Sequence, residues 1–130
     1  MTSPENVDKY LPLSEATYYI MLTLAETLHG YGVMQKVAEI SNGEVKIGPG
    51  TLYGAFINLE KEGLITKVGE EERRKSYALT QKGKMVLLRQ IERLVIMSRN
   101  GLAVSVRLSL DVWGKERQED SYEKGQSEEI

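Results

Sequence analysis

One stretch of the chain, residues 48–65, carries at helical spacing the polar groups that bind phosphates and the edges of DNA bases. Thr51 supplies a hydroxyl, Asn58 an amide and Lys61 an ammonium group. A step of about 100° per residue places six positions on one face of a helix: Gly50, Tyr53, Gly54, Ile57, Asn58 and Lys61. This face has no acid and its glycines permit close approach, so such a helix can lie in the major groove of DNA. The alternative is a surface helix whose polar side chains have no binding role.

The other side of the same stretch predicts that it is a helix. Pro49 suits the first turn, where its missing N–H group is not needed. Gly63 is a natural C-terminal stop. An apolar stripe at positions i, i+3, i+4 and i+7 is formed by Leu52, Ala55, Phe56 and Leu59. The groups with binding chemistry are therefore expected on the outer face of a helix that is anchored by its inner face.

A second cluster is cationic. Arg73, Arg74 and Lys75 form the only run of three basic residues. Alternating side chains flank this run and predict a β-hairpin with a long charged loop: Leu64, Thr66 and Val68 before it, and Lys75, Tyr77 and Leu79 after it. The basic tip would contact DNA phosphates, with Lys46 and Lys36 as further cations. The alternative is a solvated turn whose charges, including the preceding acids Glu70 to Glu72, pair with one another.

The net charge of −2 does not by itself favour a nucleic-acid partner. The charge is unevenly distributed, however. Residues 115–130 hold three basic and six acidic groups, which is −3, and this leaves +1 for residues 1–114. Because a locally basic surface can bind phosphate whatever the sum, the composition permits DNA binding.

Composition also argues against other classes. A chain of 130 residues fits one domain, and it has no cysteine for a disulfide, a thiolate metal site or a nucleophile. The single histidine, His29, has no metal-ligand spacing around it, so we expect no enzyme, no metal and no cofactor. No run approaches the ~20 apolar residues of a membrane span, and the N-terminus lacks the apolar core of a signal peptide. We therefore expect a cytoplasmic protein without membrane contact.

Periodicity predicts two helices before the one at Pro49. The first spans roughly 14–29, with Ser14 as its cap. His29 would then lie at the C-terminal end of that helix. There its side chain would interact favourably with the helix dipole, or it would simply be exposed. The second spans about 31–41. Residues 1–13, which are polar and hold two prolines, are expected to form a loose arm.

A fourth, long helix is predicted from Gln81 to about Asn100, with Thr80 as its cap. Asn100-Gly101 marks an end or a kink. Residues 102–113 are apolar with an alternation that fits a strand or a helix. Residues 114–130 are charged and poor in apolar groups, which predicts a flexible tail or a frayed helix.

The order helix, helix, helix, hairpin is that of a winged helix-turn-helix. We therefore predict a mainly α fold with a small β-hairpin, a DNA-binding domain over residues 14–80 and a C-terminal dimerisation segment over residues 81–113. The apolar stripe of the long helix should pack against the first helix or a second chain. Its members are Leu87, Leu88, Ile91, Leu94 and Val95.

At this point the sequence resembles the PadR-like transcriptional regulators of bacteria, over about residues 11–100. The motifs that carry the resemblance are Tyr31-Gly32, Gly50-Thr51-Leu52-Tyr53, Leu59 to Ile65, Arg73 to Tyr77, and Leu79 to Gly83. The resemblance implies a homodimer that represses transcription by binding palindromic double-stranded DNA. It also implies DNA contacts for Thr51, Tyr53 and Lys61, phosphate contacts for the basic hairpin residues, and a dimer contact on the C-terminal helix.

The chain is similar to the short members of that family. Some of these stack planar aromatic compounds on a tryptophan of the dimer helix, whereas Trp113 here lies beyond Gly101 and is expected to be a packing anchor. A small-molecule effector would act by favouring a dimer with the wrong spacing of its DNA-binding helices, and nothing in the sequence names it. The rival interpretation is a winged helix used only for protein contacts, which the negative net charge favours.

Overall fold

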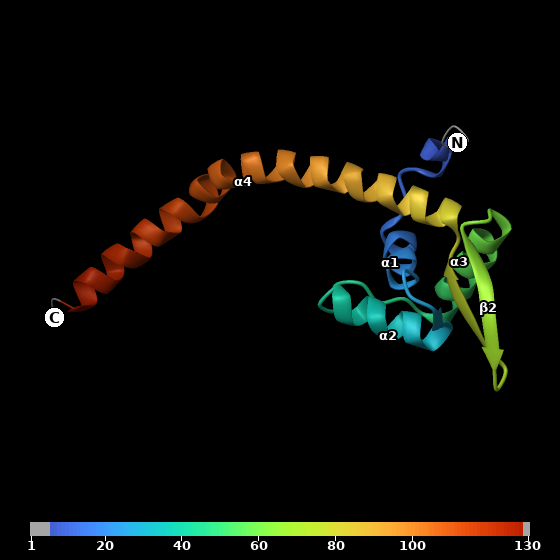
Figure 1. Cartoon of the computed structure of the whole chain (residues 1–130). Coiled ribbons are helices and arrows are strands. Elements are labelled where there is room, and N and C mark those ends of the chain that lie inside the picture. The colour runs from blue at the N-terminus through green and yellow to red at the C-terminus, as the bar shows by residue number, and fades with distance from the viewer. Residues whose placement is uncertain (1–5, 129–130) are drawn as a thin grey trace. The chain divides into compact units, whose positions relative to one another are not determined.

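A computed structural model describes the backbone of residues 6–128 and the side chains of residues 6–114. Its elements, in chain order (Figure 1), are η1 (Val7–Tyr10), α1 (Glu15–Thr23), β1 (Leu28–His29), α2 (Gly30–Ile40), α3 (Pro49–Lys61), β2 (Ile65–Glu71), β3 (Arg74–Leu79) and α4 (Gln81–Glu128). Two compact units are present, Met1–Glu92 and Arg93–Ile130, and α4 contributes to both. The prediction of a mainly helical protein with a winged helix-turn-helix and a long C-terminal helix is confirmed.

The first unit is held by one hydrophobic core. Leu52 and Phe56 of α3 are buried in it together with Ile20 and Met21 of α1 and Val33 of α2. The start of α4 belongs to the same core, because Val86 and Leu87 are buried there. Burial of apolar side chains is the main favourable term in folding, so the apolar stripes seen in the sequence are what brings these helices together.

Local signals placed several helix ends correctly. The Ser14 hydroxyl accepts a hydrogen bond from the Thr17 N–H at 3.1 Å, as expected of a cap. Pro49 occupies the first turn of α3, and Gly63 follows its end with a φ of 75°. That left-handed conformation is one that glycine adopts without steric cost.

The first helix is shorter than expected, since α1 ends at Thr23 and not near residue 29. Leu28 and His29 instead form β1, which pairs antiparallel with β3 through Leu28–Tyr77 and His29–Ser76. His29 therefore does not lie at the end of a helix. It caps the start of α2, where its Nδ1 accepts a hydrogen bond from the Gly32 N–H at 3.2 Å.

The sheet has the strand order β1-β3-β2. The hairpin loop is much shorter than predicted, because β2 and β3 are joined by only Glu72 and Arg73. A bulge between Lys67 and Gly69 interrupts the pairing and leaves Val68 exposed. The strands are thus longer than the sequence pattern indicated, and the cationic run lies at a tight turn.

Polar contacts join the end of α3 to the start of α4. The Thr80 N–H donates to the Leu64 carbonyl at 3.0 Å, and the Thr80 hydroxyl donates to the Gly63 carbonyl at 2.6 Å. The same hydroxyl accepts from the Gly83 N–H at 3.0 Å, which makes it the predicted cap of α4. Gly83 is required here, because a Cβ at this position would lie 2.0 Å from the Leu64 carbonyl oxygen.

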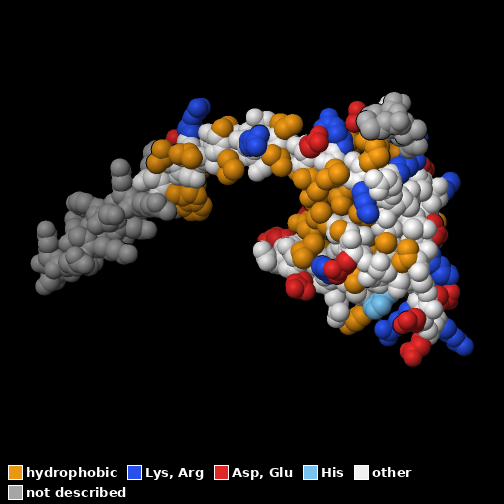
Figure 2. Space-filling view, viewed as in Figure 1, with side chains coloured by type: hydrophobic (Ala, Val, Ile, Leu, Met, Phe, Trp, Pro, Cys, Tyr) orange, Lys and Arg blue, Asp and Glu red, His pale blue; other side chains and the backbone are white. Residues whose placement is uncertain are grey.

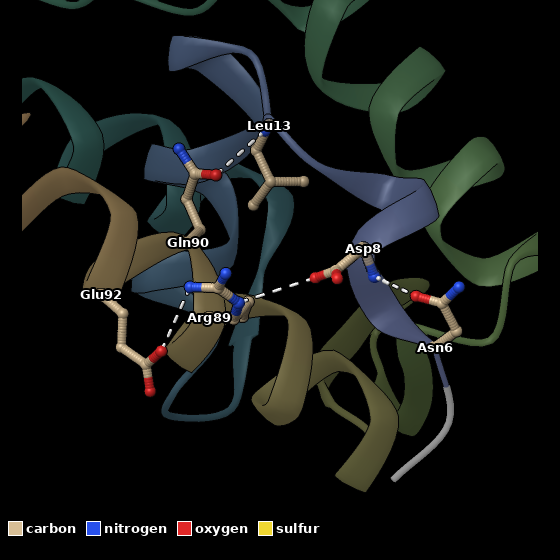
Figure 3. Close-up of polar contacts among 6 residues, drawn as sticks. All are labelled: Asn6, Asp8, Leu13, Arg89, Gln90 and Glu92. Atoms are coloured by element: carbon tan, nitrogen blue, oxygen red, sulfur yellow. Dashed lines mark hydrogen bonds and ion pairs between the residues drawn. The ribbon is translucent and has the colours of Figure 1, made fainter.

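The N-terminal segment from residue 6 onward is not the loose arm that was expected. Asp8 is paired with Arg89 of α4 at 3.6 Å, and the Leu13 N–H donates to the Gln90 side chain at 3.3 Å. Figure 3 shows both contacts. Tyr10 and Leu11 pack against the core. Residues 1–5 of the predicted arm lie outside the described residues.

The long helix is continuous through Asn100-Gly101, so the predicted end at that point is wrong. Residues 102–113 are helical, which resolves the choice between strand and helix. The backbone is helical as far as Glu128; the flexibility of residues 114–130 stays a prediction. Of the helices that the structure describes, none has the length and hydropathy needed to cross a membrane.

We predict that Gly83→Ala lowers the free energy of unfolding by about 2 kcal/mol or more, the effect expected of overpacking against a fixed backbone. The added methyl group cannot avoid the Leu64 carbonyl without moving α4 away from the end of α3. Urea denaturation followed by circular dichroism measures this change.

Gly54→Ala is the matched control. It is also a glycine inside a helix, but nothing lies within 4 Å of a Cβ built at Gly54. Replacement should stabilise the fold by about 0.5–1 kcal/mol through helix propensity alone. Equal effects of the two substitutions would contradict the role assigned to Gly83.

Candidate nucleic-acid interface

The outer face of α3 is uncovered within the described part of the chain. All six positions that the sequence placed on it are exposed: Gly50, Tyr53, Gly54, Ile57, Asn58 and Lys61. Thr51 is exposed as well. The inner face is fixed by Leu52, Phe56 and Leu59, each at most 4% exposed. The helix therefore presents its small and polar residues on a rigid support.

Helices α2 and α3 pack closely at Gly30. A Cβ at Gly30 would lie 3.2 Å from Leu52 Cδ2 and 3.3 Å from the Tyr53 hydroxyl oxygen. This glycine thus lets the first turn of α2 approach α3 closely. As a result, Tyr31 at the start of α2 and Tyr53 on α3 both line one cleft, which is described below.

The hairpin tip is charged with both signs. Arg73, Arg74 and Lys75 are exposed, and Figure 2 shows basic and acidic side chains together at this tip. Glu72 and Arg73 have φ values of 49° and 68°, the backbone of a two-residue turn that asparagine and glycine prefer. The turn keeps two large charged residues in a conformation that costs them energy, which is typical of residues retained for binding.

One of the acids in β2 is neutralised locally. Glu70 forms an ion pair with Lys67 at 2.7 Å, and this hydrogen bond holds the pKa of Glu70 below its ordinary value. The same bond raises the pKa of Lys67. Lys67 is thereby occupied, while Glu71 and Glu72 are exposed. Glu70 thus pairs with a lysine of its own strand and not with the basic run at the tip.

A cleft of about 630 Å³ separates the hairpin from α3 and the start of α2. Aromatic rings form part of its wall, with Phe56 and Tyr77 4.7 Å apart between ring centroids. Partial burial, followed by the nearby Glu60 carboxylate, raises the pKa of Tyr77. A tyrosine hydroxyl is protonated at neutral pH and is a hydrogen-bond donor, and Tyr77 is one of the residues that line the cleft.

The structure brings some predicted residues together at this cleft and leaves others apart. Tyr53, Arg73, Arg74 and Lys75 line it. Asn58 lines a smaller hollow on another side of α3, beside the N-terminal segment. Other exposed predicted positions that do not line the cleft are Lys46, Gly50, Thr51, Gly54 and Lys61. Lys36, a suggested extra cation, is paired with Glu26 at 2.6 Å.

Sequence reasoning missed four residues of the cleft: His29, Tyr31, Glu60 and Tyr77. Tyr31 is 59% exposed and its hydroxyl accepts from the Gln35 side-chain amide at 3.0 Å. The Tyr31-Gly32 pair was noticed only as part of a family motif, and periodicity alone assigns it no role. Within the described residues, no three histidine, cysteine or acidic side chains are grouped as metal ligands would be.

The dimerisation stripe predicted on α4 is also divided. Leu87 is 6% exposed and packs in the core of its own unit, one of the two arrangements expected for the stripe; its part in a dimer contact stays a prediction. Ile91 packs against the same core. Leu88 and Val95 are exposed, at 62% and 42%. These two remain available for contact with another chain.

Three helices and a hairpin wing, with an uncovered third helix, define a winged helix-turn-helix fold. The transcriptional regulator PadR-like family matches residues 19–89, which is more than half of the chain. The protein therefore belongs to the PadR-like family of transcriptional regulators, a family of regulators and not of enzymes.

Individual proteins are also similar to this chain. A PadR-like transcription factor from Bacteroides fragilis has 25% identity and a TM-score of 0.60, over 77% of this chain and 99% of that one. A transcriptional regulator from Clostridium thermocellum has 25% identity and a TM-score of 0.55, over 72% and 90%. An uncharacterised 37.1 kDa protein in a Streptomyces fradiae transposon is 30% identical over 86 residues, 65% of this chain. The chain spans 24% of the length of that curated relative.

We predict that Glu72→Asn raises the free energy of unfolding by about 0.5–1 kcal/mol, because asparagine tolerates positive φ better than glutamate. Thermal unfolding of the variant and the parent protein measures the gain. Glu71→Asn is the control, since residue 71 belongs to β2 and has no positive φ. An equal gain in the control would attribute the effect to lost charge and not to the turn.

Proposed function

We propose that this protein is a sequence-specific DNA-binding repressor that binds a palindromic operator as a homodimer. The observation that carries the proposal is the uncovered outer face of α3 beside a cationic hairpin tip. A face of small and polar residues next to a basic wing matches the major groove and its flanking phosphates. The protein would act in the cytoplasm, where bacterial DNA lies.

In this proposal α3 enters the major groove. Gly50 and Gly54 let the helix backbone approach the base pairs, and a Cβ at either position would meet nothing within 4 Å. Asn58 is the candidate for base readout, since its amide matches the edge of adenine with two hydrogen bonds. Phosphate contacts are assigned to Thr51, Tyr53, Lys61 and Lys46.

The wing would contact the DNA backbone or the adjacent minor groove through Arg73, Arg74 and Lys75. Arginine is suited to both, because its planar guanidinium forms two hydrogen bonds to phosphate and carries charge into a narrow minor groove. The Tyr31 and Tyr77 hydroxyls beside the cleft are further candidates for phosphate contact. Glu60, which lines the same cleft, opposes phosphate at its position.

In this proposal α4 forms the contact between the two copies of the homodimer. Its exposed large apolar side chains are Leu88, Val95, Ile96, Met97, Leu102, Val104, Val106, Leu108, Leu110, Val112 and Trp113. So many exposed apolar side chains on one helix are typical of an interaction site. A second copy would cover it and set two α3 helices about 34 Å apart, one turn of DNA. Bound at a promoter, such a dimer blocks polymerase, and an effector could release it by favouring another spacing.

We predict that Arg73→Ala combined with Arg74→Ala weakens binding to all DNA sequences alike. Lost phosphate contacts reduce counterion release, so the slope of log affinity against log salt should flatten by about 0.9 for each contact. Fluorescence anisotropy on labelled duplexes at several salt concentrations measures both quantities.

Lys84→Ala is the matched control for the wing variant. Lys84 is exposed on the first turn of α4 and does not line the cleft. It should leave the slope unchanged. An unchanged slope in the Arg73 and Arg74 variant would instead remove the wing from the interface.

Selection of bound duplexes from a random pool tests the function directly. The wild-type protein should select a palindrome whose half-sites lie one helical turn apart. Asn58→Ala should select the same palindrome with the preference lost at one adenine in each half-site. Loss of one bidentate contact should lower the discrimination between adenine and the other bases by about 1–3 kcal/mol.

Three results would contradict these assignments. A uniform loss of affinity in Asn58→Ala, with the preferred sequence unchanged, would make Asn58 a phosphate contact. Failure of the wild-type protein to enrich any sequence would leave the winged helix as a protein-interaction module. A monomer at micromolar concentration would remove the two-fold symmetry on which the palindrome depends.

A further inference from the structure

Ile57 is the most exposed large hydrophobic side chain among the described residues, at 71%. It lies in the middle of α3, and it lines the edge of the cleft that the basic hairpin residues also line. Asn58, the next residue, faces a different hollow beside the N-terminal segment. Ile57 therefore stands between the cationic cleft and the proposed base-reading amide.

Ile57 has a residue without a side chain on one side of it. Gly54 precedes it by one turn, and a Cβ at Gly54 would meet nothing within 4 Å. A β-branched apolar side chain that projects from such a surface gains nothing in the isolated chain. It gains free energy when a partner with an apolar group fits against it.

We infer that Ile57 recognises the 5-methyl group of thymine in the major groove, an inference that rests on the DNA-binding function proposed above. Thymine is the base that presents an apolar group in that groove. Charge complementarity favours DNA as the partner, because Arg73, Arg74 and Lys75 line the cleft that Ile57 borders. With Asn58 on adenine, adjacent side chains of α3 would both recognise A·T pairs.

The test uses deoxyuridine, which differs from thymine only by the missing methyl group. Each thymine of the selected half-site is replaced singly, in both half-sites together, and affinity is measured by anisotropy with the full-length protein. Wild-type protein should lose about fourfold per half-site at one thymine position, the effect of one buried methyl group. The other thymine positions should show no such loss.

The same duplexes are then measured with Ile57→Ala. This variant should bind the thymine duplex as weakly as wild-type protein binds the deoxyuridine duplex, and it should not distinguish the two duplexes. Ile57→Val should retain part of the discrimination. Because Ile57 is exposed, neither substitution should impair folding, and thermal unfolding verifies this.

Ile40→Ala is the matched control, since Ile40 is also an exposed isoleucine, at 42%, at the end of α2. It should discriminate as the wild-type protein does. Insensitivity of wild-type protein to every deoxyuridine, or undiminished discrimination by Ile57→Ala, would overturn the inference while DNA binding stands. Absence of any selected duplex would instead refute the function on which the inference rests.

Discussion

The bonded junction between the end of α3 and the start of α4 is the constraint on which the rest of the first unit depends. Backbone carbonyls just past the end of a helix need partners from elsewhere in the chain. Here the Lys82 ammonium donates to the Glu62 carbonyl at 3.1 Å, and Thr80 donates to the carbonyls of Gly63 and Leu64. Gly83 then lets α4 press directly on the Leu64 backbone. The outer face of α3 thus keeps a fixed position relative to the first turns of α4, and a ligand or dimer partner that moved those turns would move α3.

Charge placement, and not the charge sum, decides whether such a face can bind DNA. Ionic interactions between exposed groups fade beyond a Debye length of roughly 8 Å, so the acidic residues of 115–130 do not cancel a basic cluster by composition alone. Within the wing, Lys67 neutralises Glu70, while the three cations of the tip line the cleft. Glu60 lines the same cleft and limits where a phosphate can lie. The protein can therefore carry a net negative charge and still offer phosphate-binding groups at one place.

Features encoded by neighbouring residues were predictable, and features that need a distant partner were not. Pro49, Gly63 and the Thr80 cap each act within one helical turn, so the ends of α3 and the start of α4 followed from the sequence. The two-residue strand β1 exists only because β3 pairs with it, some fifty residues away. Because His29 belongs to this strand, it caps α2 and does not end the first helix. The cleft could not be predicted from the sequence for the same reason. Its lining residues Tyr31, Glu60 and Tyr77 come from three elements that only the fold brings together.

The alternation of residues 102–113 could not distinguish a strand from a helix because α4 is apolar on two sides. Steps of 100° place Leu88, Val95, Leu102, Val106 and Trp113 along one side, and Met97, Val104 and Leu108 along the opposite one; all of them are exposed in the single chain. A two-helix coiled coil buries only one narrow stripe of each helix. Under the proposed homodimer, one such seam would leave the second stripe in water. Covering both stripes in the proposed homodimer would take more than one element of the partner, which a pair of helices along a single seam does not supply.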